Sequence, residues 1–250
     1  MLFSHIDQDI IVHIIKKAGE ATLEIYDKSF SVKTKNDRSP LTEADIVAND
    51  IICSFLASHY PDIPVLSEEN KTVPYEVRKS WEIYWCIDPI DGTKEFINRN
   101  GEFTINIALI YHNEPVIGAV FAPALDELYI AKKGEGAYKN GIRLTAKSSS
   151  SQRLRVVASR SHMTEETKRF IDELPSDNIE IVSKGSSLKL CMVAEGSADI
   201  YPRLAPTMEW DTAAADAIVR EAGKMTYRYD TDEPLRYNKE NLLNPWFVVR

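Results

Sequence analysis

The sequence predicts a mixed α/β protein built from two subdomains. Two helical patterns come first, a series of closely spaced strand patterns follows, and strands alternate with helices over the last part of the chain. Adjacent strands with short connections favour an antiparallel or mixed sheet, whereas strand–helix alternation is typical of α/β folds. The serine-rich stretch at residues 147–152 predicts the boundary between a first subdomain, residues 1–147, and a second, residues 153–250.

The composition restricts the class of protein. The chain has 250 residues, which allows a substantial core, and its formal net charge is -8. That charge argues against a general nucleic-acid binder, although bound metal ions can still attract a small anionic substrate. The three cysteines are far apart and form no disulfide framework, which favours the reducing cytoplasm. No apolar run is long enough to span a membrane and the N-terminus lacks a signal peptide, which leaves peripheral membrane attachment open.

The first helix is predicted over residues 6–28, where isoleucines recur at helical spacing, and a short strand follows at residues 30–33. The second helix begins after Thr42, its expected N-cap, and continues to about Tyr60. Asp45 occupies the third helical position of an approximate capping box. Two interpretations of Asp45 therefore stay open, helix-start electrostatics and a functional carboxylate.

Strands and helices of the remaining chain follow from apolar runs and turn signals. Strands are predicted at residues 64–67, 83–87, 103–111, 115–122, 127–131, 154–158, 179–182 and 199–201, with a hairpin turn at Asn140-Gly141. Helices are predicted at residues 164–174, 187–195 and 211–222. The first strands thus form one sheet, which the first two helices flank.

The most informative stretch is Asp88-Pro89-Ile90-Asp91-Gly92-Thr93, which ends the apolar strand at residues 83–87. Its two carboxylates are hard oxygen ligands of the kind that Mg²⁺ prefers, and the turn leaves the Ile90 carbonyl available as another. Gly92 allows a phosphate to approach the backbone, and the Thr93 hydroxyl can orient a water. The simpler alternative is a polar turn without a ligand.

Further carboxylates lie beside the ends of other predicted elements, at Asp45, Glu68 and Asp211. Two divalent cations held by such a set can bind both the attacking water and the leaving oxygen of a phosphate ester. The sequence therefore indicates a metal-dependent phosphatase. For Glu68, which precedes Glu69, the alternative is a solvated loop.

Residues 88–93 resemble the first signature of the inositol monophosphatase superfamily of Mg²⁺-dependent, lithium-sensitive phosphatases. Residues 210–218 resemble its second signature, and residues 41–45 and 67–69 match in order and spacing, so the likeness spans nearly the whole chain. One departure is Lys224 after Gly223, where the family has two small residues. The resemblance implies a sugar-phosphatase-like α+β fold, a layered αβαβα sandwich of two subdomains, and two or three Mg²⁺ ions.

Within the superfamily, residues 39–42, 94–96, 159–162, 185–189 and 207–211 resemble the 3'(2'),5'-bisphosphate nucleotidase branch. The resemblance implies that a metal-activated water hydrolyses adenosine 3',5'-bisphosphate (PAP) to AMP and phosphate. It implies a small nucleotide as partner, no nucleic acid, and either a monomer or a homodimer. The alternatives are a phosphatase for inositol phosphates or fructose 1,6-bisphosphate in the same superfamily, and a catalytically silent nucleotide-binding protein.

The resemblance also implies the roles of individual residues. The metal ligands are Glu68, Asp88, the Ile90 carbonyl, Asp91 and Asp211. The residues that orient and deprotonate the water are Asp45 and Thr93, with Glu68 acting through a bound water. The substrate contacts are Glu68, Ile90, Asp91, Gly92, Thr93, His162, Gly185, Ser186, Lys189 and Asp211.

Three of these substrate residues have a simpler structural interpretation. His162 can cap the helix that begins near Thr164, Ser186 can be the N-cap of the next helix, and Lys189 can lie on a solvated face. Cys191 and Met192 are expected in the core, and Asp216 on the helix surface.

Overall fold

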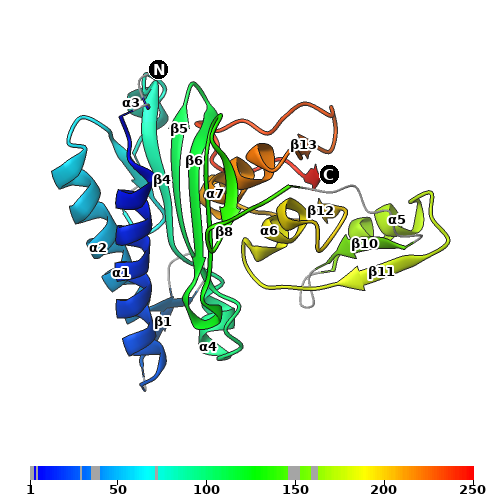
Figure 1. The fold of residues 1–250 in the computed structure, drawn as a ribbon, viewed down its shortest axis with the longest axis horizontal. Coiled ribbons are helices and arrows are strands. Elements are labelled where there is room, and N and C mark those ends of the chain that lie inside the picture. Colours follow the sequence, from blue (N-terminus) through cyan, green and yellow to red (C-terminus); the bar gives the residue numbers. More distant parts are fainter. Residues whose placement is uncertain are drawn as a thin grey trace.

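Helices and strands alternate in five layers (Figure 1). The computed structural model of the chain describes residues 3, 5–28, 30–34, 40–70, 73–145, 153–158 and 163–250. Helices α1 (Gln8–Tyr26) and α2 (Glu43–His59) cover one face of a large sheet, and α6 (Leu188–Glu195) and α7 (Glu209–Glu221) lie on its other side. A smaller set of strands follows, with α5 (Glu165–Asp172) outermost. The predicted αβαβα layering is therefore confirmed.

The large sheet has seven strands in the order in which they occur in the chain. They are β3 (Val65–Ser67), β4 (Ile83–Asp91), β5 (Thr104–Tyr111), β6 (Glu114–Ala122), β7 (Glu127–Lys132), β8 (Gly136–Lys139) and β9 (Ile142–Arg143). Only β3 and β4 pair in parallel, so the sheet is mixed, as expected. The short elements around it are β1 (Val32–Thr34), β2 (Pro40–Thr42), α3 (Tyr75–Arg78), α4 (Thr93–Ile97) and the 3-10 turn η1 (Pro123–Leu125).

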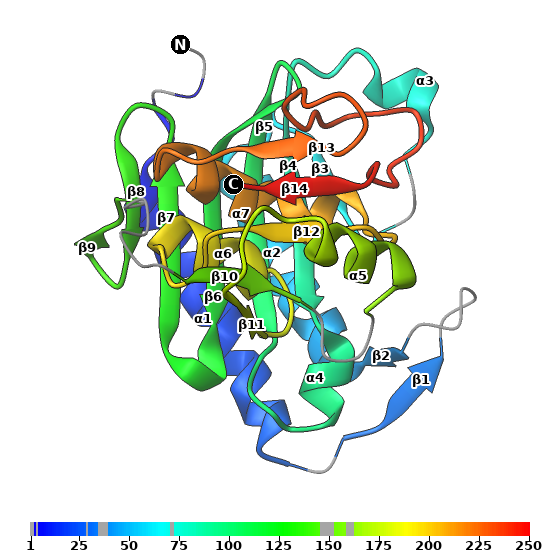
Figure 2. The same ribbon diagram turned by 90° about the vertical axis from the view of Figure 1, so that its right-hand side faces the viewer.

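The second half forms two small sheets that lie edge to edge. Strands β10 (Leu154–Val157) and β11 (Ile179–Val182) are parallel, and β14 (Phe247–Val249) lies between β12 (Tyr201–Arg203) and β13 (Thr226–Arg228) (Figure 2). The Val157 N–H donates to the Ile200 carbonyl at 2.9 Å and joins the two sheets. The predicted strand–helix alternation is present, but β13 and β14 were not expected.

Two apolar clusters fill the faces of the large sheet, because successive side chains on a strand point to opposite sides. Trp85 and Ile87 of β4 pack with α1 and α2, whereas Tyr84 and Cys86 pack with α6 and α7. Helix α7 approaches very closely, since a Cβ on Gly118 of β6 would lie 2.1 Å from the carbonyl oxygen of Ala214. The alanine-rich composition of α7 is therefore needed for this close packing.

Several sequence predictions need correction. The last helix begins at Glu209 rather than at residue 211, and the strand expected at residues 199–201 lies at Tyr201–Arg203. Asp216 is not on the surface: it is fully buried and accepts hydrogen bonds from Arg220 and Tyr237. The C-terminal segment covers this side of α7, which the helix pattern alone does not reveal. The boundary at residues 147–152 lies outside the described residues.

Within the described part of the chain, no helix has both the length and the apolar character needed to cross a membrane. The three cysteines are free, and Cys191 is fully buried in the core as expected.

We expect Gly118→Ala to destabilise the fold by about 3 kcal/mol, because the added methyl group meets the backbone of α7, which cannot move aside. The matched control is Gly223→Ala, where a Cβ meets nothing within 4 Å and only the left-handed backbone, φ 90°, adds a cost of about 1 kcal/mol. Urea unfolding of both variants measures the difference, and equal midpoints would contradict the packing argument.

Candidate metal and phosphate site

Three carboxylates from distant parts of the chain meet in space. Glu68, Asp88 and Asp211 each place one carboxylate oxygen within 4.8 Å of the other two. Glu68 follows β3 and Asp88 lies in β4, and these neighbouring strands are parallel, so their carboxyl ends lie at the same edge of the sheet. Asp211 comes from the first turn of α7 on the other side. The expected convergence of ligands from separate segments is thus observed.

The Asp88 to Thr93 segment is not a simple turn after a strand. Strand β4 continues to Asp91, and its register with β5 shifts between Asp88 and Asp91. The Ile90 N–H donates to the Asp88 carboxylate at 3.1 Å, and Gly92, with φ 87°, turns the chain into α4 at Thr93. The irregular register lets one strand end carry two carboxylates, and it places the Ile90 carbonyl 3.4 Å from the Thr93 hydroxyl instead of in the strand ladder.

Asp45 caps a helix and also contacts Thr93, and its role as a functional carboxylate stays a prediction. One carboxylate oxygen, Oδ2, accepts the Thr42 N–H at 2.7 Å and the Thr42 hydroxyl at 2.6 Å, which caps α2. The other, Oδ1, accepts the Thr93 hydroxyl at 3.4 Å. Since Asp45 is almost fully buried, these contacts fix the side chain with Thr93 at the rim of the carboxylate cluster.

The carboxylates raise each other's pKa. Burial raises the pKa of Asp88 well above its usual value, and the negative charges of Glu68, Asp91 and Asp211 add to the effect. Burial and the neighbouring Asp91 raise the pKa of Asp211 to about 8. Burial raises the pKa of Asp91 to about 6, although the Lys189 ammonium opposes the shift. Such a group of repelling carboxylates suits divalent cations, which supply the positive charge that the residues lack.

The carboxylates form one wall of the site, and two cations, Lys189 and Arg203, form what we call its cationic wall. A cavity of about 60 Å³ lies beside the carboxylates. Its lining comprises Asp91, Ser186, Ser187, Lys189, Leu190, Tyr201, Arg203, Thr207, Asp211, Thr212 and Phe247. Burial lowers the pKa of Lys189, which is only partly exposed and lines this cavity, so it does not lie on a solvated helix face. The volume fits a phosphate group rather than a whole nucleotide, since pockets for drug-sized ligands measure about 300–1,000 Å³.

Ser186 and Gly185 connect this cationic wall to the first wall. The Ser186 hydroxyl lies 2.8 Å from the Asp91 carbonyl oxygen and 2.7 Å from that of Glu102, and the Gly185 N–H donates to the Glu102 carboxylate. The N-cap of α6 is Ser187 rather than Ser186, because Ser186 has a left-handed backbone with φ 52°. Ser186 thus anchors the segment to β4 and Gly185 anchors it to Glu102 before β5, and their contact with substrate stays a prediction.

The structure describes some of the other expected residues but not all of them. His162, like residues 39 and 159–161, lies outside the described ranges. Phe96 of the Lys94-Glu95-Phe96 motif is fully buried against Tyr26, Phe30 and Phe103, so it supports α4 from the core.

The sequence reasoning missed Arg203, Tyr201 and Thr207, which line the cavity. The signal was available: Arg203 is a cation in a short apolar strand pattern eight residues before Asp211. A larger cavity, about 660 Å³, lies away from the carboxylates around Arg228, Arg236 and Lys239. Each of these cations already pairs with an acid, so this cavity offers no comparable anion site.

This arrangement of carboxylates on an αβαβα fold belongs to a known class. The model of the inositol monophosphatase family matches residues 7–245, so the chain belongs to that family. It is 45% identical to the 3'(2'),5'-bisphosphate nucleotidase CysQ of Shigella flexneri, over 96% of this chain and 98% of the relative.

Solved structures of related proteins have a similar fold. The crystal structure of CysQ from Bacteroides thetaiotaomicron superposes with a TM-score of 0.88 at 46% identity, covering 98% of each chain. An inositol monophosphatase (IMPase) of Thermotoga maritima has a TM-score of 0.79 at 26% identity, covering 97% of this chain and 91% of its own.

The raised pKa values predict how stability depends on pH. Between about pH 4, where an unfolded aspartate titrates, and the folded values of about 6 and 8, the metal-free folded protein binds more protons than the unfolded chain. The free energy of unfolding from this site therefore falls as pH rises through that window. Metal binding requires ionised carboxylates and releases these protons.

We therefore expect Mg²⁺ to raise the melting temperature more at pH 8.5 than at pH 6, with affinity rising up to about tenfold per pH unit for each proton released. Thermal unfolding with and without Mg²⁺ at both pH values, against NaCl of equal ionic strength, measures the effect. An equal stabilisation at the two pH values would contradict the assignment of these carboxylates.

Proposed function

We propose that this protein hydrolyses the 3'-phosphate of adenosine 3',5'-bisphosphate to give AMP and phosphate. The observation that carries the proposal is one cavity lined both by carboxylates, Asp91 and Asp211, and by the cations Lys189 and Arg203. A substrate with two phosphates can place one at each wall. The 45% identity to a 3'(2'),5'-bisphosphate nucleotidase over nearly the whole chain supports the same substrate class.

The carboxylate wall suits Mg²⁺, and we assign Glu68, Asp88, the Ile90 carbonyl, Asp91 and Asp211 as ligands of two or three ions. When bound, such ions lower the pKa of a coordinated water and offset negative charge on the phosphate oxygens. The proximity of three of these carboxylates, within 4.8 Å, supports the assignment.

Asp45 and Thr93 act on the attacking water. The Thr93 hydroxyl lies 3.4 Å from both the Asp45 carboxylate and the Ile90 carbonyl oxygen, and when it donates to Asp45 its oxygen lone pairs accept a hydrogen bond from the attacking water. The bond between Asp45 and the backbone of Thr42 keeps this pair in place during turnover. Glu68, at the end of β3, assists from the opposite side of the cluster.

The scissile phosphate lies at the start of α4, where we propose that the N–H groups of Gly92 and Thr93 contact its oxygens. The second phosphate binds Lys189 and Arg203, which add charge-assisted hydrogen bonds. His162, Gly185 and Ser186 complete the proposed set of nucleotide contacts. The free cysteines support a reducing compartment, and we propose the cytoplasm.

A phosphatase for single sugar phosphates is the principal rival. An inositol monophosphate carries one phosphate, so Lys189 and Arg203 would face no partner anion in such a complex. The Thermotoga inositol monophosphatase is also less similar, at 26% identity. A silent nucleotide-binding protein is the rival of another class, but it gives no reason for the converging carboxylates.

Phosphate release from three substrates distinguishes these functions. With Mg²⁺ present, we expect turnover of adenosine 3',5'-bisphosphate to exceed that of inositol 1-phosphate by at least about 10²-fold in kcat/KM, because inositol 1-phosphate lacks the second phosphate and each missing charge-assisted contact costs about 1.5–3 kcal/mol. It should also exceed turnover of fructose 1,6-bisphosphate, which has two phosphates but no nucleoside. Preference for either sugar phosphate would overturn the nucleotidase assignment. Absence of release from all three would indicate the silent protein.

The cationic wall has a separate test. Lys189→Met should lower kcat/KM for adenosine 3',5'-bisphosphate by about 10–100-fold and change that for adenosine 3'-monophosphate, which lacks the second phosphate, by less than about threefold. Arg203→Met should behave alike. Lys139→Met, remote from the cavity, is the control for loss of a partly buried lysine. Equal losses on both nucleotides would contradict a role in binding the second phosphate.

A further inference from the structure

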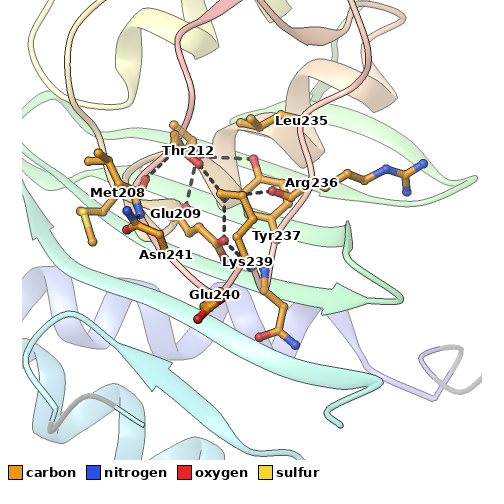
Figure 3. A network of polar contacts seen from close by, with 12 residues as sticks. Met208, Glu209, Thr212, Leu235, Arg236, Tyr237, Lys239, Glu240 and Asn241 are labelled. Atoms are coloured by element: carbon orange, nitrogen blue, oxygen red, sulfur yellow. Dashed lines mark hydrogen bonds and ion pairs between the residues drawn. The ribbon is translucent and has the colours of Figure 1, made fainter. Parts of the chain in front are cut away.

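A buried ion pair lies beside the start of α7, outside the proposed set of catalytic and ligand residues. Glu209 is fully buried, and its carboxylate accepts the Lys239 ammonium at 2.6 Å (Figure 3). The same carboxylate accepts the backbone N–H groups of Asn238 at 2.7 Å and Lys239 at 2.9 Å, and lies 3.4 Å from the Tyr84 hydroxyl. A buried carboxylate with this many donors is fixed in position, since moving it would leave several donors unsatisfied.

The contacts of Glu209 join three separate elements. Tyr84 belongs to β4, the strand that carries Asp88, and Asn238 with Lys239 belongs to the segment between β13 and β14. Asn238 in turn accepts a hydrogen bond at 2.9 Å from the buried guanidinium of Arg78, the last residue of α3. Glu209 itself lies two residues before Asp211 on the same helical turn. One side chain thus fixes the start of α7 relative to β4.

The neighbouring backbone supports the same turn. Leu242 accepts the Glu209 N–H at 2.9 Å, and the Asn244 side chain donates to the Met208 carbonyl at 2.7 Å and to the Thr212 hydroxyl at 3.0 Å. The Asp211 carboxylate caps the helix by accepting the Met208 N–H at 2.9 Å. The first turn of α7 is therefore held in place by residues 238–244.

We propose that Glu209, through its ion pair with Lys239, is a positioning residue for the metal ligand Asp211. The inference rests on the proposed function, in which Asp211 binds Mg²⁺. In the metal-free site, repulsion between the carboxylates pushes Asp211 away from Glu68 and Asp88. The contacts of Glu209 oppose this displacement. Removing a residue that orients a metal ligand typically weakens metal affinity by about 10–100-fold.

Lys239→Met tests the proposal without disturbing the backbone hydrogen bonds to Glu209. We expect isothermal titration calorimetry on the metal-free protein to show Mg²⁺ affinity about tenfold weaker. The Mg²⁺ concentration for half-maximal activity should rise in parallel, with kcat at saturating Mg²⁺ unchanged within about twofold. Glu209→Gln should have a larger effect, because its amide group faces an N–H donor.

Lys139→Met is the matched control. Lys139 has the same exposed side-chain fraction as Lys239, 26%, and also pairs with carboxylates, those of Glu127 and Glu195. It should lose stability without losing Mg²⁺ affinity. If Lys239→Met binds Mg²⁺ as tightly as Lys139→Met, or loses kcat at saturating Mg²⁺ with no change in affinity, the positioning role is overturned. Lys239→Met decides the outcome even if Glu209→Gln does not fold.

Asp211→Asn separates this inference from the proposed function. Normal Mg²⁺ affinity in Asp211→Asn would overturn the metal assignment itself. Weak binding in Asp211→Asn together with normal binding in Lys239→Met would overturn only the role of Glu209.

Discussion

Mutual repulsion among buried carboxylates is the constraint on which the rest of this structure depends. Glu68, Asp88 and Asp211 lie within 4.8 Å of one another, and burial with like charge raises the pKa values of Asp88, Asp91 and Asp211. No local pattern of hydrogen bonds would hold such a group, because each carboxylate gains by moving away from the others. The fold opposes this separation by placing the carboxylates on elements that are fixed by packing elsewhere. The large sheet fixes the ends of β3 and β4, and the close contact of α7 at Gly118 fixes the helix that carries Asp211.

The same residues often meet a structural and a chemical requirement together. Asp45 caps α2 with one oxygen and contacts Thr93 with the other, so the helix start and the water-orienting pair cannot move independently. Ser186 contacts the Asp91 carbonyl, and its hydroxyl occupies the space where a side chain at Gly92 would lie, 2.1 Å from a Cβ there. That contact requires glycine at position 92 beyond any need of the phosphate. Positions of this kind explain why local sequence patterns allowed two interpretations.

Much of the fold followed from sequence because its elements have strong local signals. The isoleucine spacing of α1, the Thr42 capping box and the Asn140-Gly141 turn were each sufficient, and the motif at Asp88 to Thr93 pointed to the strand end where the carboxylates gather. The errors concern features set by distant contacts. Asp216 is buried because Tyr237 and the C-terminal segment cover α7, and Arg203 reaches the cavity because β12 pairs with β14. Neither pairing has a signal within the residues concerned, since the partners are far apart in sequence.

The two walls of the site have different structural origins, and this separation bears on specificity. The carboxylate wall comes from the large sheet, α2 and the start of α7, whereas Lys189 and Arg203 come from α6 and β12 of the second half. The Ser186 hydroxyl on the Asp91 carbonyl joins the segment before α6 directly to the β4 motif. Lys189 also lowers the pKa of Asp91, so substitutions among these cations change the carboxylate cluster as well as the space for a phosphate ester. The similar fold of an inositol monophosphatase at 26% identity is consistent with one scaffold serving different esters. In the proposed function, substrate choice therefore rests with Lys189 and Arg203 of the second half, and hydrolysis with the carboxylates of the first half together with Asp211.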